Sequence, residues 1–140
     1  MVTTEQARAM VAAGETRASE IGIGVVIAIV DVGVHLKAFS RMDEAVLGSI
    51  DIALGKARTS ALFRIPSEAV WDYCKPGAPA PTLELSNGGL MTFAGGLPLT
   101  LANGAYVGAV GVSGGAPAQD HEVALAVVAA LASLAPSVST

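Results

Sequence analysis

The sequence predicts a mixed α/β (α+β) fold, in which helices flank one five-stranded antiparallel sheet in the order α-β-β-α-α-β-β-β-α. Two observations support this class. Segments with helical periodicity enclose short runs rich in β-branched residues. Tight turn sequences join neighbouring strands, and strands joined in this way cannot be parallel. A chain of 140 residues has the usual size of one domain, so we expect a single domain over residues 1–140.

The first half of the chain predicts a helix, a hairpin and a second helix. Thr3 and Gln6 have the spacing of a capping box, and apolar residues follow them at helical spacing. A β-branched run then leads into the turn candidate Asp31–Val34, and an alanine-rich stretch follows the hairpin. The expected elements are a helix at about residues 4–21, strands at 25–30 and 35–40, and a helix at 44–63.

The second half predicts a short helix, three strands and a closing helix. Pro66 should stop the second helix, and Ser67 can cap a short helix through Tyr73. Asn103-Gly104 is a strong signal for a tight hairpin. The proline-rich segment 75–81 predicts an ordered loop. The expected elements are strands at 90–93, 97–101 and 105–112, and a strongly apolar helix at about 117–134.

Composition narrows the classes of partner. Charged residues make up 14% of the chain against about 25% in typical domains, which favours a homo-oligomer that buries apolar surface. A net charge of −4 does not favour binding to nucleic acid or to anionic lipid. The start of the chain does not read as a secretory signal, and its apolar runs are about half a membrane span, so we expect a cytoplasmic protein without a membrane partner. The single cysteine, Cys74, excludes an internal disulfide and a cysteine-cluster metal site.

Polar residues gather in two segments that could form a site, residues 40–43 and residues 119–122. In the first, Arg41 with Asp43 is either a pair that clamps a ligand or an ion pair that fixes a turn. In the second, Asp120 and His121 begin the closing helix. His121, like His35 at the start of a strand, is either a haem or metal ligand, a proton shuttle or a surface residue.

Two further features have a structural and a functional interpretation. Lys56 lies among alanines on the second predicted helix, where it either points inward as a usable base or belongs to a solvated face. Gly114, with Gly115, precedes a helix start, so it could present N–H groups to an anion, although Asp120 in the first turn opposes one. The alternative is that the glycines of this chain serve tight turns and close packing.

Four stretches, taken in order, form a recognisable set: VVIAIVDVGVHLKAFSRMDEA, GSIDIALGKARTSALF, LSNGGLMTFAGGLPL and GAVGVSGGAPAQDHEVA. GGLP followed by GVSG and QD-x-E is a specific combination. The set resembles the GlcG/HbpS family, which includes the C-terminal domain of PduO-type cobalamin adenosyltransferases. The resemblance implies a profilin-like sandwich and homo-oligomers, often octamers. Some members of that family look like haem-binding or redox-sensing proteins, and others accompany glycolate or propanediol pathways.

The resemblance also marks positions in this chain. Val34 departs from the pattern, because many relatives have a second glycine there, and it should stiffen the turn beside His35. The positions that match the family pattern are Asp31, Gly33, His35, Arg41, Asp43, Lys56, Thr59, Gly114 and Asp120.

Three functions remain open at this point. One is a small-ligand-binding protein that takes haem or a related tetrapyrrole, with His35 or His121 as axial ligand and Gly114 close to the cofactor, although an aromatic content of 4% argues mildly against it. Another is a cofactor-independent lyase, isomerase or hydrolase for a small carboxylated or oxygenated metabolite. In it, Arg41 or Lys56 binds the anion, and Asp120 or His121 moves protons. The last is a non-catalytic assembly subunit.

Overall fold

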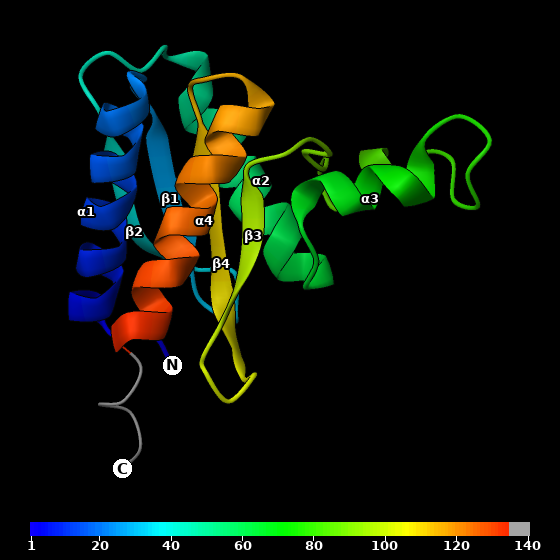
Figure 1. Ribbon diagram of the computed structural model, residues 1–140. Coiled ribbons are helices and arrows are strands. Elements are labelled where there is room, and N and C mark those ends of the chain that lie inside the picture. Colours follow the sequence, from blue (N-terminus) through cyan, green and yellow to red (C-terminus); the bar gives the residue numbers. More distant parts are fainter. Residues whose placement is uncertain (135–140) are drawn as a thin grey trace.

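The structure, a computed structural model, describes residues 1–134. Its helices and strands follow the predicted order with one strand fewer (Figure 1). The elements are α1 (Thr4–Ile21), β1 (Val26–Val30), β2 (Leu36–Arg41), α2 (Gly48–Phe63), α3 (Ser67–Cys74), the short 3-10 helix η1 (Leu83–Leu85), β3 (Gly96–Thr100), β4 (Tyr106–Ser113) and α4 (Pro117–Leu134).

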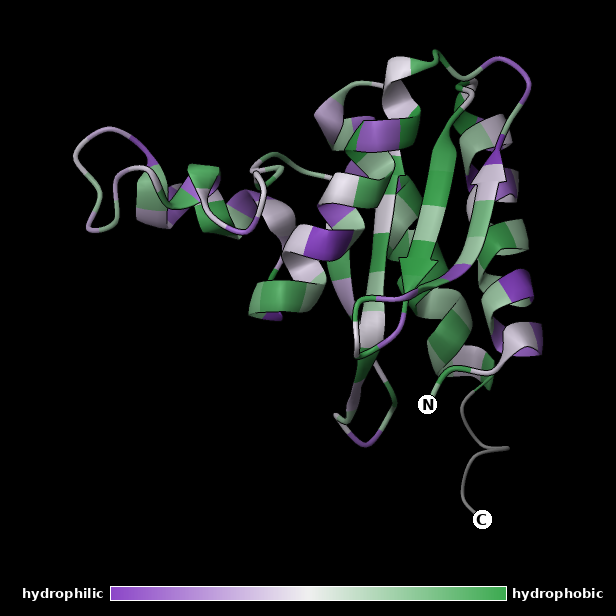
Figure 2. Cartoon of the chain, turned by 180° about the vertical axis from the view of Figure 1, so that it is seen from behind, coloured by the Kyte–Doolittle hydropathy of each residue, from purple (hydrophilic) through white to green (hydrophobic). Residues whose placement is uncertain are grey.

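One antiparallel sheet in the order β2-β1-β4-β3 forms the middle layer. Alternate residues of β1 divide the core. Ile27 and Ile29 belong to a cluster with α1 and α4, whereas Ala28 packs with Ala57 of α2. Helices α1 and α4 therefore cover one face and α2 covers the other (Figure 1). The hydropathy colouring of Figure 2 shows β1 as largely hydrophobic, in agreement with its burial along its whole length.

The local signals place two elements accurately. Thr3 and Gln6 form the predicted capping box, with the Gln6 amide donating to Thr3 Oγ1 at 3.0 Å and the Thr3 amide donating to Gln6 Oε1 at 2.9 Å. Helix α1 then covers the expected residues and ends at Gly22, which has a φ of 81°. Asn103-Gly104 joins β3 to β4, as the hairpin signal predicted.

The prediction of a fifth strand was wrong. Residues 90–93 pair with no strand; their backbone bonds to helix side chains instead. The Met91 amide donates to Thr59 Oγ1 of α2 at 3.0 Å, and the Phe93 carbonyl accepts from Ser67 Oγ of α3 at 2.6 Å. Side chains that satisfy these backbone groups remove the need for a neighbouring strand.

Two helix starts also differ from the prediction. Helix α2 begins at Gly48 rather than at residue 44, because the Met42 amide bonds to the Val25 carbonyl and a turn follows. Ser67 does not cap α3: it is the first helical residue, and Pro66 holds the cap position. The Ser67 hydroxyl instead accepts from the Gly96 amide at 2.9 Å, which ties α3 to the start of β3.

Helix α3 and the loop that follows it extend away from the sheet as an arm (Figure 1). Cys74 at the end of α3 is buried, and burial raises the pKa of its thiol, in line with an inert cysteine. Over residues 1–134, the structure has no helix that is both long and apolar enough to span a bilayer.

Candidate functional site

Ionisable and aromatic side chains from three helices and one loop meet where α4 begins. Lys56 comes from α2, Glu68 from α3, Phe93 from the loop before β3, and Asp120 and His121 from the first turns of α4. We call these five residues the α4-start cluster. Its inner part is a buried ion pair and its outer part is open to solvent, and the two parts are described in turn.

Lys56 and Asp120 form the inner part. The exposed fraction of the side chain is 0% for Lys56 and 2% for Asp120. Lys56 Nζ donates to Asp120 Oδ2 at 3.2 Å and to the Val112 carbonyl at 2.9 Å, and it lies 4.6 Å from the centre of the Phe93 ring. The ammonium group therefore points inward, one of the two orientations that the sequence left open, and it is surrounded by partners.

A glycine makes this position possible. Strand β3 begins at Gly96, so the Lys56 side chain passes the end of the sheet beside Gly95. A Cβ atom at Gly95 would lie 2.5 Å from the Val112 oxygen and 2.7 Å from Lys56 Nζ, and the residue has a φ of +129°. Only glycine combines that backbone conformation with the missing Cβ.

Asp120 is anchored by the backbone in front of α4 as well as by Lys56. The Gly115 amide donates to Asp120 Oδ1 at 2.9 Å, and the Ala116 amide donates to Gln119 Oε1 at 2.9 Å. The Gly115 N–H, a candidate donor to an external anion, is therefore occupied by the protein's own carboxylate. A carboxylate near a helix N-terminus is stabilised by the N–H groups there.

Burial dominates the electrostatics of the pair. It raises the pKa of Asp120, a shift that the Gly115 amide and Lys56 oppose, and it lowers the pKa of Lys56, a shift that Asp120 opposes. Both shifts point toward the neutral forms, because taking two charges out of water costs more than their attraction returns. The pair behaves as a structural link between α2 and α4, and neither side chain reaches the surface of the subunit.

His121, Glu68 and Phe93 form the outer part. The side chain of His121 is 35% exposed, but its Nδ1 atom is buried and has no hydrogen-bond partner. Glu68 Oε2 lies 3.8 Å from that atom, and Glu68 Oε1 is likewise buried without a partner. The exposed part of this side chain therefore lies away from Nδ1, and Nε2 forms no hydrogen bond within the described residues. Phe93, whose ring contacts Lys56 of the inner part, is 40% exposed.

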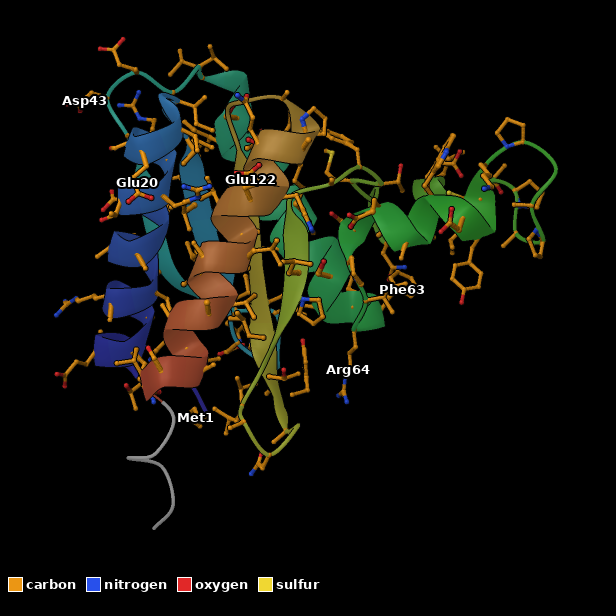
Figure 3. All side chains as sticks on the ribbon, in the orientation of Figure 1. Met1, Glu20, Asp43, Phe63, Arg64 and Glu122 are labelled. Carbon is orange, nitrogen blue, oxygen red and sulfur yellow. The ribbon has the colours of Figure 1, made fainter. Side chains whose placement is uncertain are left out.

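The other predicted residues lie apart from this cluster. Arg41 ends β2 at the same end of the sheet as α4, because Val26 pairs with both Arg41 and Ser113. Within residues 1–134 it forms no ion pair with Asp43, and both are exposed. Figure 3 shows Asp43 in the loop after β2 and Glu122 on α4 beside α1, where Glu122 bonds to Arg17 at 3.0 Å.

His35 lies at the opposite end of β1. Its ring is 81% exposed and stands 3.4 Å from Asp31, whose carboxylate accepts from the amides of Gly33 and His35 at 2.9 Å. These bonds, led by the His35 amide, lower the pKa of Asp31. Val34 has a φ of +67°, so a β-branched residue occupies the left-handed region where a glycine fits without strain. The two histidines are not brought together.

Sequence reasoning missed Glu68 and Phe93. Glu68 looked like any polar residue in the first turn of a short helix, and Phe93 was assigned to a strand that does not form. Glu68 approaches His121 and Phe93 contacts Lys56 across long separations in the sequence, which no local pattern reports. Over the described residues, no group of three or more His, Cys, Asp or Glu side chains is arranged to hold a metal ion.

Comparison with known proteins gives a consistent result. The family model of "Haem degrading protein HbpS-like" matches residues 2–129. A 15.0 kDa protein from the dhaT-dhaS intergenic region of Citrobacter freundii is 41% identical over 124 residues, which cover 88% of this chain and 87% of that protein. Protein GlcG of Escherichia coli K12 is 38% identical over 114 residues, 81% of each chain.

Solved structures agree with the fold. The crystal structure of the PduOC:haem complex superposes with a TM-score of 0.86 at 31% identity, and the match covers 91% of this chain and 93% of that one. The similarity thus spans the whole sheet and the helices on both of its faces.

Proposed function

The chain belongs to the HbpS-like family, and from that premise we propose that it is a small-ligand-binding protein whose ligand is haem or a related tetrapyrrole. The observation that carries the proposal is the haem complex of PduOC, a domain that matches nearly the full length of this chain. Haem iron in proteins takes axial ligands such as histidine, cysteine, methionine or tyrosine. Its pocket must also offer apolar and aromatic surface to the macrocycle.

His121 fits the role of axial ligand better than His35 does. His121 is half-buried in the first turns of α4, with Nδ1 buried and Glu68 of α3 at 3.8 Å. The His35 ring projects almost entirely into solvent from a turn, so the surrounding structure buries little of it. A metal-binding histidine usually holds its other nitrogen against a carboxylate or carbonyl, and Glu68 is placed for that.

Exposed aromatic side chains on α3 and in the loop before β3 would supply contact surface for a flat ring. Phe93 is 40% exposed, and Trp71, at 41%, lies one turn beyond Glu68 on α3, so Trp71 and Glu68 share one side of that helix. A bound haem would supply redox and gas-ligand chemistry at its iron, while these residues hold and orient it. Lys56 and Asp120 would act indirectly, by fixing the start of α4 that carries His121.

The enzyme alternative has less support from this geometry. Lys56 and Asp120, two of its proposed groups, are buried against each other and offer no free atom to a substrate in the subunit. Arg41 is exposed at the end of β2, an edge strand that β1 separates from β4.

A titration of the purified protein with haemin tests the proposal. We expect a saturable shift of the Soret band in the wild type and in His35→Ala, and loss of that shift in His121→Ala. Because His35→Ala removes the only other histidine, it is the matched control. A shift that survives both substitutions, or no shift at all, would contradict histidine-ligated haem binding and would redirect the search to turnover of small carboxylates and aldehydes.

We also propose that the subunit assembles with copies of itself. The structure exposes large apolar side chains on the β1–β2 hairpin, in the loop before α2, and on α3 and η1. Surfaces of this kind are usually buried by association. Light scattering should give a mass that is a multiple of 14.0 kDa, and a monomer at micromolar concentration would contradict the proposal. The exposed residues are Val32, Leu36, Phe39, Val46, Leu47, Trp71, Tyr73 and Leu85.

A further inference from the structure

We propose that Glu68 is a positioning residue that holds His121 with its proton on Nδ1, so that Nε2 faces outward with a free lone pair. This inference rests on the proposed function for its purpose, since a lone pair on Nε2 is what a haem iron binds. It concerns a property of the protein without ligand, however, so it can be measured separately.

Two unsatisfied atoms point to the pairing. His121 Nδ1 and Glu68 Oε1 are both buried, and neither has a hydrogen-bond partner. Glu68 Oε2 lies 3.8 Å from Nδ1, which is too long for a hydrogen bond but within reach after a small side-chain rotation. Buried polar atoms without partners are costly. A bond from Nδ1 to Oε2 would satisfy the histidine, and a rotation of the carboxylate that brings Oε1 to Nδ1 would satisfy both buried atoms.

The surroundings leave Glu68 as the available partner for this nitrogen. Asp120, the neighbour of His121 in sequence, has one carboxylate oxygen bonded to Lys56 and the other to the Gly115 amide. Glu122, the neighbour on the other side, bonds to Arg17 of α1. Glu68 has no other bond within the described residues, and it comes from a different helix, so the contact would also fasten α3 to α4.

A carboxylate on Nδ1 has a chemical consequence at Nε2. It selects the Nδ1–H tautomer, restricts rotation of the ring and strengthens donation from the Nε2 lone pair to a metal. Loss of such an outer partner typically lowers metal affinity about 10- to 100-fold. We therefore expect Glu68→Gln to weaken haemin binding by at least about 10-fold and to raise the reduction potential of the bound iron, while Asp72→Asn, on the same helix, changes neither.

The decisive measurement uses the protein without haem. In a His35→Ala background, His121 is the only histidine, so ¹⁵N signals of labelled histidine report its tautomer without ambiguity. At pH 9, where an imidazole is neutral, we expect the Nδ1–H form to dominate, to be lost in Glu68→Ala and to persist in Asp72→Asn. An Nε2–H form, or a tautomer that Glu68→Ala leaves unchanged, would overturn the inference.

The outcomes separate the two proposals. If the tautomer depends on Glu68 but haemin does not bind, the positioning role stands and the proposed ligand is wrong. If haemin binds through His121 but the tautomer of His121 is the same with and without Glu68, the proposed function stands and the positioning role is wrong. A circular dichroism spectrum and a melting curve for each variant exclude misfolding as the cause of either result.

Discussion

Replacing Lys56 by methionine should strongly destabilise the protein. Lys56→Met keeps most of the side-chain volume but leaves the Asp120 carboxylate buried, with the Gly115 amide as its remaining strong partner. Removing one partner of a buried ion pair typically costs about 3–5 kcal/mol. For a domain of this size that corresponds to roughly 10–15 °C in Tm.

The pH dependence of that loss has a definite sign. Burial already raises the pKa of Asp120, and losing the ammonium group would raise it further. A carboxyl whose pKa is higher in the folded state than in the unfolded state favours folding below the unfolded value, about 3.8, and loses that contribution as pH rises through the folded pKa. The destabilisation by Lys56→Met should therefore be larger at pH 8 than at pH 4.

Urea unfolding followed by circular dichroism measures these effects, at one protein concentration because assembly adds to apparent stability. Lys75→Met is the matched control: its exposed ion pair with Asp72 should contribute less than about 1 kcal/mol. The double variant Lys56→Met with Asp120→Asn should recover much of the loss, since no buried charge remains. A cost below about 1 kcal/mol for Lys56→Met, or no recovery in the double variant, would refute the structural role of the pair.

Two other substitutions test the packing around the cluster. Gly95→Ala should cost at least about 2 kcal/mol more than Gly77→Ala: both have positive φ, but only at Gly95 does a Cβ collide, with Lys56 and a backbone oxygen. Equal melting temperatures for the two would argue against the close passage of Lys56. Ser67→Ala should cost about 2–3 kcal/mol, because it leaves a buried amide and a carbonyl without their partner, whereas Ser86→Ala on the arm should cost less than about 1 kcal/mol. Similar urea midpoints for Ser67→Ala and Ser86→Ala would contradict a stabilising role for the two hydrogen bonds of Ser67.

The parts of the fold that local chemistry controls could be predicted from the sequence. The capping box at Thr3 and Gln6 and the Asn103-Gly104 turn act on residues close by, and both elements came out as expected. The segment 90–93 failed because its apolar run satisfies a strand pattern, yet the hydroxyls of Thr59 and Ser67 occupy its backbone groups. Those bonds join residues 32 and 26 positions apart, which a local pattern does not report.

The same distinction between local and long-range interactions applies to the candidate site. Composition and helical spacing could place Lys56 on α2 and leave open whether it points inward, but they could not name Asp120, 64 positions away, as its partner. That pairing depends on where β3 starts and on the missing Cβ of Gly95. At Gly95 and at Gly111, where a Cβ would lie 2.0 Å from the Ala53 oxygen, the structural interpretation of the glycines holds: they allow α2 to lie close to the sheet.

This division suggests how members of one family could differ in ligand. The motif residues that carry the resemblance are largely internal here: the GGLP segment starts β3 past Lys56, GVSG ends β4, and the Asp of QD-x-E is buried against Lys56. They specify the sheet and the start of α4. The position that the motif QD-x-E leaves unspecified is residue 121, the half-exposed histidine. A chain that keeps the motif would then keep the fold while residue 121, with its neighbours on α3, sets the chemistry at the surface.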